Sequence, residues 1–112
     1  MKHSRINAYR IMWLFVFFDL PVTKKRDRRA ATRFRKRLLK DGFSMMQYSV
    51  YTRHCASRES AKVHTKRVKG FVPPKGHVTL FSITDKQYSN ILNFWGEKRE
   101  PMDKPPPQLE MF

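Results

Sequence analysis

The chain has 112 residues, of which 40% are hydrophobic and nine are Phe, so it suits one globular domain and is not a disordered chain. Its 24 Lys and Arg against 9 Asp and Glu give a formal net charge of +15, which points to a polyanionic partner, either nucleic acid or an anionic membrane surface. The single Cys excludes an internal disulfide and a cysteine-rich zinc site.

An apolar run near the N-terminus is the first predicted element. Basic residues precede "IMWLFVFF" at residues 11–18, in an order that resembles the first two regions of a signal peptide. The run ends in Asp19 with no small-residue cleavage site, and it is far too short to span a bilayer. We therefore expect a cytoplasmic protein with no membrane partner. Residues 1–10 are interpreted as an N-terminal extension, and residues 11–18 as a strand buried on both faces.

The next segment predicts a helix that is unusually basic. Thr23 or Asp27 can cap its start, and Gly42 can end it. Residues 24–40 contain ten basic residues and one acidic residue, whereas a solvated helix normally mixes the two signs. This face is therefore the strongest signal for nucleic-acid contact. The residues expected to contact phosphates are Lys24, Lys25, Arg26, Arg28, Arg29 and Arg33.

The middle of the chain predicts a strand region and a second helix. Residues 43–54, "FSMMQYSVYTRH", form either two short strands joined at residues 47–49 or one long bent strand. Ser57 is expected to cap a helix that continues to about Lys69. The thin apolar face of this helix consists of Ala61, His64 and Val68.

Two further strands complete the predicted domain. Residues 77–83, "HVTLFSI", alternate cleanly, and residues 91–95 are a candidate for a short final strand. The order of elements over residues 11–96 predicts an α+β fold of the ferredoxin-like type, βαββαβ with an extra C-terminal strand. Its helices leave one sheet face open, so we expect a homodimer packed sheet to sheet. The Pro-rich residues 97–112 are interpreted as an extended tail that docks on a partner.

Asp19 is the candidate functional carboxylate. It lies between the apolar strand and a turn that contains Pro21, where an Asp commonly serves the turn itself. The alternative is a metal ligand at the end of a strand. One carboxylate is a poor magnesium site, but a two-fold axis near Asp19 would supply a second one. The pattern of residues leaves both interpretations open.

The His, Ser and Gly residues give only weak signals for a catalytic or phosphate-binding site. The four His residues show no i, i+4 pair, and His64 fits a core position better than a ligand position. The Ser residues lack a nucleophile motif with an evident base, and the four Gly residues form no phosphate-binding loop. We find no base-reading motif, so the expected binding mode is phosphate contact without sequence preference.

Four motifs in order resemble the CRISPR-associated Cas2 family. They are "FFDLPV", "RFRKRLLKDGF", "MMQYSVYTR" and "ITDKQY", and together they span about residues 12–95. The Asp-Leu-Pro turn, the helix end and the "QYSVYTR" run are most similar to members found beside Cas9 effectors, in type II systems. The N-terminal extension and the Pro-rich tail depart from the plainest members of the family.

The resemblance implies a homodimer of ferredoxin-like protomers in which Asp19 faces its twin across a cleft. It implies a magnesium-dependent endonuclease acting on RNA or DNA, with Asp19 as catalytic residue and Mg²⁺ ligand. It also implies a bridge between Cas1 integrase dimers, across which a double-stranded prespacer DNA lies. We favour the architectural function, with the phosphodiesterase as the alternative. A general RNA-binding protein would explain the charge but not Asp19.

Overall fold

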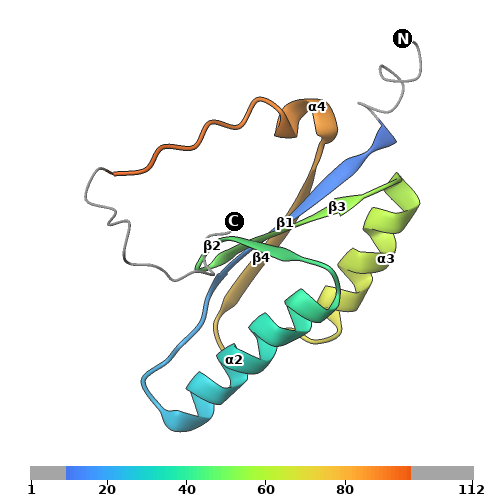
Figure 1. The fold of residues 1–112 in the computed structure, drawn as a ribbon. Coiled ribbons are helices and arrows are strands. Elements are labelled where there is room, and N and C mark those ends of the chain that lie inside the picture. The colour runs from blue at the N-terminus through green and yellow to red at the C-terminus, as the bar shows by residue number, and fades with distance from the viewer. Residues whose placement is uncertain (1–9, 97–112) are drawn as a thin grey trace.

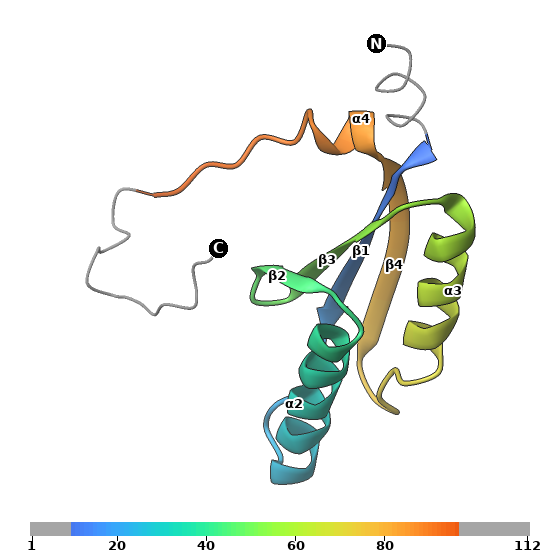
Figure 2. The ribbon, with the colours of Figure 1, turned by 45° about the vertical axis from the view of Figure 1, so that its right-hand side comes forward.

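The computed structural model describes residues 10–96, in which four antiparallel strands form one sheet in the order β2-β3-β1-β4 (Figure 1). The elements alternate as the ferredoxin-like prediction requires, and they confirm a mixed α+β fold. Helices α2 and α3 lie on the same side of the sheet (Figure 2). In chain order the elements are β1 (Met12–Asp19), α2 (Lys25–Lys40), β2 (Ser44–Gln47), β3 (Val50–Cys55), α3 (Arg58–Lys69), β4 (His77–Thr84) and α4 (Asp85–Tyr88).

Strand β1 is central, because it pairs with β3 on one side and with β4 on the other. Its side chains alternate between the two faces of the sheet. Those of Leu14 and Val16 belong to the hydrophobic core with Phe34 and Leu38 of α2. Burial of such side chains contributes about 1.5–3 kcal/mol each. The opposite face of β1 carries Trp13, Phe15 and Phe17.

The expected capping of α2 by Thr23 or Asp27 is wrong. The N-cap residue is Lys24, which has an extended backbone and no side-chain capping hydrogen bond. Thr23 lies one residue too early to cap this helix, and Asp27 lies inside the first turn, where its charge complements the helix dipole instead. At the other end the prediction is confirmed, because Gly42 has a φ of 93° and follows the last turn.

The segment 43–54 forms two strands, which resolves the alternative that the sequence left open. Strands β2 and β3 form a hairpin whose connection is Tyr48 and Ser49. The predicted cap of α3 is also confirmed, since the Ser57 hydroxyl accepts a hydrogen bond of 3.0 Å from the backbone N–H of Ser60. The buried residues of α3 are Ala61, His64 and Val68, as expected.

The predicted final strand at residues 91–95 is wrong, and with it the extra C-terminal strand within the described part of the chain. Strand β4 is followed at once by α4, whose N-cap Thr84 forms a capping box with Gln87. Helix α4 directs the chain away from the free edge of β4, so residues 91–96 find no strand to pair with (Figure 1). Leu92 and Phe94 of this segment are exposed.

Helix α4 is held against β1 by a side-chain contact and a ring stack. The indole Nε1 of Trp13 donates a 2.7 Å hydrogen bond to Oδ1 of Asp85. The ring of Tyr88 stacks on Trp13 at a centroid distance of 3.7 Å. The motif "ITDKQY" therefore contains the short helix α4, which packs on Trp13 at one end of the open sheet face.

Some predictions fall outside residues 10–96. These are most of the N-terminal extension, residues 1–10, and the Pro-rich tail, residues 97–112. Among the helices that the structure describes, none has the length and apolar composition needed to cross a lipid bilayer.

Candidate nucleic-acid and metal site

Asp19 is the last residue of β1, and its side chain is exposed. On one side of it, the strand register pairs Asp19 with His77 of β4. On the other side, the backbone N–H of Phe18 donates a 3.1 Å hydrogen bond to the carbonyl of Ser49. The alternation of β1 places Asp19 on the sheet face that α2 and α3 leave open. The strand end thus lies between the start of β4 and the hairpin turn at Tyr48.

The turn before β4 packs tightly against this strand end. Gly76 has a φ of +100°, and a Cβ atom there would lie 2.7 Å from Cδ2 of Leu20 and 2.9 Å from the carbonyl oxygen of Asp19. Only Gly fits such a close approach without displacement of the backbone. This contact holds His77 beside Asp19. The sequence pattern assigned His77 no role, because no local spacing connects two residues so far apart in the chain.

The donors at the strand end fit a magnesium site only in part. Mg²⁺ prefers oxygen ligands and is usually held by one or two carboxylates together with waters and phosphate oxygens. Asp19 supplies one carboxylate per protomer, and no cluster of three or more His, Cys, Asp or Glu occurs among residues 10–96. A second copy of the chain, with its Asp19 near the same axis, would supply a second carboxylate.

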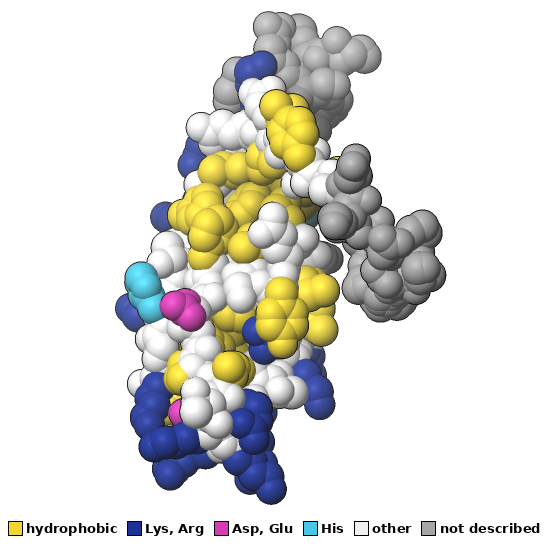
Figure 3. Space-filling model, turned by 90° about the vertical axis from the view of Figure 1, so that its left-hand side faces the viewer, with side chains coloured by type: hydrophobic (Ala, Val, Ile, Leu, Met, Phe, Trp, Pro, Cys, Tyr) yellow, Lys and Arg dark blue, Asp and Glu magenta, His cyan; other side chains and the backbone are white. Residues whose placement is uncertain are grey.

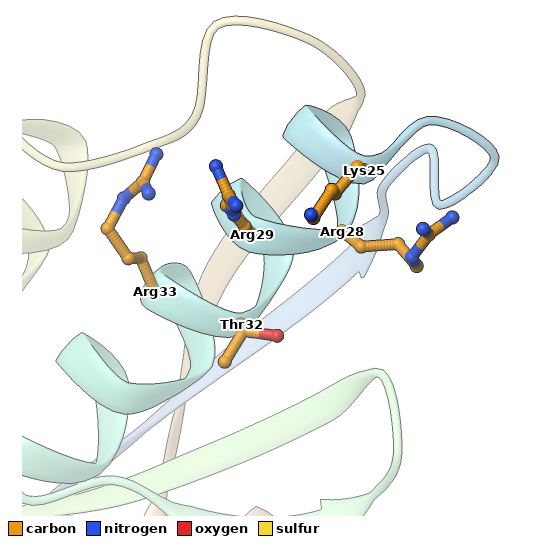
Figure 4. Close-up of a pocket in the computed structure, with 5 residues that line it drawn as sticks. All are labelled: Lys25, Arg28, Arg29, Thr32 and Arg33. Carbon is orange, nitrogen blue, oxygen red and sulfur yellow. The ribbon is translucent and has the colours of Figure 1, made fainter.

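The N-terminal half of α2 forms a basic hollow of about 410 Å³ (Figure 4). Of the six predicted phosphate contacts, four line this hollow and two, Lys24 and Arg26, do not. Arg29 and Arg33 extend side by side from successive turns of the helix (Figure 4). The lining residues are Lys25, Arg28, Arg29, Thr32 and Arg33.

Arg28 differs from its neighbours because its side chain forms hydrogen bonds to the backbone just before the helix. Its Nη1 donates hydrogen bonds to the carbonyl oxygens of Val22 at 3.2 Å and Thr23 at 2.8 Å. These bonds hold the segment that connects β1 to α2. Sequence spacing could not show this, since Arg28 looks like every other cation of the run.

The cations of α2 have no carboxylate partners within residues 10–96, where both ion pairs involve Asp41. Lys and Arg side chains gather at the lower end of the molecule in Figure 3, at the level of the start of α2 in Figure 1. Their positive potential is therefore not neutralised within the described fold, and it favours an external anion.

Arg35, later in α2, packs against aromatic rings. Its Cζ atom lies 3.9 Å from the ring centroid of Tyr48 and 5.2 Å from that of Phe18. Its Nε atom is buried and has no hydrogen-bond partner. Tyr48 is 69% exposed, so this pair lies at the surface beside the end of β1. Neither residue stood out in the sequence.

Asp41 forms the one charged network in the described chain, and this network joins the two helices. Its Oδ2 lies 2.8 Å from Nδ1 of His64, and its Oδ1 accepts a 3.0 Å bond from Nη1 of Arg67. Burial raises the pKa of Asp41, but the hydrogen bonds from His64 and Arg67 outweigh that effect and leave the pKa below its ordinary value. His64 is thus a buried histidine with a partner, as the sequence indicated.

The open sheet face carries an aromatic cluster. Phe15 and Phe81 stack at a centroid distance of 5.3 Å, and Phe17 meets Phe81 edge to face, also at 5.3 Å. Phe17 is 43% exposed and Phe81 is 39% exposed. Hydrophobic side chains also lie above the basic end in Figure 3.

Comparison with known proteins gives a consistent result. A family model described as "CRISPR associated protein Cas2" matches residues 12–91. A protein of Flavobacterium psychrophilum named "CRISPR-associated endoribonuclease Cas2" is 50% identical over 110 residues, which cover 98% of this chain and 96% of that protein. A protein of the same name from Parvibaculum lavamentivorans is 52% identical over 101 residues, which cover 90% of this chain and 100% of that protein.

Proposed function

Because the chain belongs to the CRISPR-associated Cas2 family, we propose that it acts in the cytoplasm as the dimeric bridge of a Cas1 integrase complex and binds prespacer duplex DNA through phosphate contacts. The motifs around Asp19 and Tyr48 support a place beside a Cas9 effector, because they resemble members from such systems. Both statements go beyond the endoribonuclease name that the relatives carry.

The unpaired cations of α2 carry this proposal. Arg29 and Arg33 reach into the hollow, and no carboxylate of the described fold neutralises them. Duplex DNA presents phosphates at close intervals and releases condensed counterions when cations replace them. A surface of this kind binds without regard to sequence, which suits a protein that must accept many different prespacers.

The open sheet face supports the homodimer. Phe17 and Phe81 expose apolar surface on the side that lacks α2 and α3. A second copy packed against this face would bury these rings and bring the two Asp19 carboxylates toward a shared axis. Two basic helices would then flank one DNA path.

A salt titration of duplex binding tests the proposal. The double variant Arg29→Glu and Arg33→Glu reverses two charges in the hollow and should weaken binding to all duplex sequences alike. The slope of log affinity against log salt should fall in magnitude by about 0.9 for each phosphate that the variant no longer neutralises.

The matched control reverses two charges elsewhere. Lys62 and Lys66 are exposed on α3, so Lys62→Glu with Lys66→Glu changes the net charge equally. If the two double variants weakened binding to the same extent, the effect would be one of total charge, and the hollow on α2 would not be the binding surface.

A second candidate function is a metal-dependent endonuclease. The observation that favours it is the exposed carboxylate of Asp19 beside His77 at a strand end, in a chain whose relatives are named endoribonucleases. Asp19 from each of two protomers would hold Mg²⁺, which would supply charge neutralisation at the scissile phosphate and an activated water. The cations of α2 would orient the substrate in either case.

A further inference from the structure

We propose that Tyr48, supported by Arg35, is a stacking platform for an unpaired nucleobase of the nucleic acid whose phosphates α2 binds. The inference rests on the proposed nucleic-acid binding. It adds which feature of the nucleic acid the protein would recognise beside the C-terminal end of β1. That feature is a base outside a duplex, in a DNA or RNA single strand.

The ring of Tyr48 has one covered face and one free face. The guanidinium of Arg35 lies over the ring, with its Cζ atom 3.9 Å from the centroid. Because 69% of Tyr48 is nevertheless exposed, the opposite face of the ring is open to solvent. A tyrosine that served only the core would bury this surface, as Tyr51 does at 2% exposure.

The hairpin holds Tyr48 in place before any ligand arrives. It lies in the short connection between β2 and β3, and neighbouring Ser49 accepts a 3.1 Å bond from the backbone of Phe18. Arg35 is itself fixed by a second ring, because its Cζ atom lies 5.2 Å from the centroid of Phe18. A ring held in this way loses little conformational freedom when a base stacks on it.

Arg35 has no carboxylate partner among residues 10–96, where both ion pairs involve Asp41. Its Nε atom is buried, so the donors for a phosphate are the terminal Nη groups. A guanidinium has five N–H donors and matches a phosphate well. A nucleotide that stacks its base on Tyr48 therefore has a cation close by for its phosphate.

A base that stacks on Tyr48 must be unpaired, as at the end of a nucleic-acid strand, rather than in the middle of a duplex. Arg35 lies on the same helix as the basic hollow, and Tyr48 flanks the end of β1 at Asp19. A paired base is already stacked on its neighbours and cannot reach a protein ring, whereas an unpaired base can. Stacking on aromatic rings tolerates every base, because each base presents a π-face.

The test uses single strands that contain the fluorescent base 2-aminopurine, as DNA and as RNA, beside a blunt DNA duplex of the same length. Wild-type protein should change the 2-aminopurine emission and bind the single strand. Tyr48→Ala should weaken single-strand binding roughly 5- to 150-fold and leave duplex affinity and its salt slope unchanged.

Two further variants control for the fold and for the cation. Tyr48→Phe keeps the ring and should bind single strands as the wild type does. Arg35→Lys keeps the charge but loses the planar guanidinium that stacks on Tyr48 and its paired N–H donors. It should therefore weaken single-strand binding while duplex binding persists. Thermal melting of each variant checks that the hairpin remains folded.

The outcomes separate this inference from the proposed function. Equal losses of duplex and single-strand binding in Tyr48→Ala would overturn the platform, as would no loss in either. A change of oligomeric state in Tyr48→Ala would assign the ring to a protein contact and would also overturn it. Single-strand binding without duplex binding by the wild type would remove the proposed bridge and keep the platform. The DNA and RNA arms decide which strand the platform takes.

Discussion

Asp19 and His77 lie opposite each other in the register of β1 and β4, although most of the domain separates them in the sequence. The turn at Gly76 fixes this relationship, because its backbone packs directly on Asp19 and Leu20. The open sheet face therefore ends in a carboxylate and an imidazole. Any chemistry at this end depends on how firmly the turn holds them.

The first prediction concerns that turn. Gly76→Ala places a Cβ atom 2.7 Å from Cδ2 of Leu20 at a φ of +100°, so it should lower the free energy of unfolding by about 1–3 kcal/mol. Urea denaturation followed by circular dichroism measures this. Gly96→Ala is the control, because a Cβ atom at Gly96 meets nothing within 4 Å. Equal stability of the two variants would contradict the close approach.

The second prediction concerns stability in acid. The pKa of Asp41 is lowered, so its ionised form stabilises the fold above the ordinary pKa of an aspartate. This contribution should decline as the pH falls below about 4 and through the lowered pKa of the folded protein. Asp41→Asn should remove that part of the pH dependence, measured as the urea midpoint at several pH values. Asp27→Asn, away from His64 and Arg67, is the control, and an unchanged acid profile in Asp41→Asn would refute the account.

Much of this fold follows from local sequence patterns, and the missing final strand shows one place where such patterns fail. The apolar run of β1, the Gly42 stop and the Ser57 cap are set by neighbouring residues, so they are predictable. The strand expected at residues 91–95 needed an edge to pair with, and α4 leads the chain away from β4. Alternation of apolar residues cannot report whether such an edge is available.

The same limit applies to the site. Asp19 and the basic run are recognisable because each is conspicuous within a few residues of sequence. His77 and the pair of Arg35 with Tyr48 are not, because their partners come from other elements. A cross-strand neighbour exists only once the topology is known.

The third prediction tests the proposed dimer. Phe17→Glu places a charge on the open sheet face at a residue that is 43% exposed, so the protomer should fold while the dimer dissociates. Sedimentation at low micromolar concentration should then give the 13.5 kDa mass of one chain. Leu39→Glu, at an exposed position on α2, is the control and should stay dimeric. A monomeric wild-type protein would contradict the sheet-to-sheet dimer.

The last prediction separates the two functions at Asp19. Asp19→Ala removes one carboxylate from each protomer, and hence both from a site on a two-fold axis. Intrinsic nuclease activity that depends on these carboxylates should fall by orders of magnitude. Duplex binding through α2 should persist and even strengthen slightly, because two negative charges leave the vicinity of the phosphates.

Both activities are measured on the same purified variant, with Asp27→Ala as the control. Asp27→Ala removes the same charge from the first turn of α2 without touching the strand end, so it should leave cleavage intact. The architectural function expects the Asp19→Ala protein to support integration by the Cas1 complex while cleavage disappears. Loss of integration in a variant that still folds, dimerises and binds DNA would mean that the carboxylate itself serves integration, and the enzyme would then be the better description of this protein.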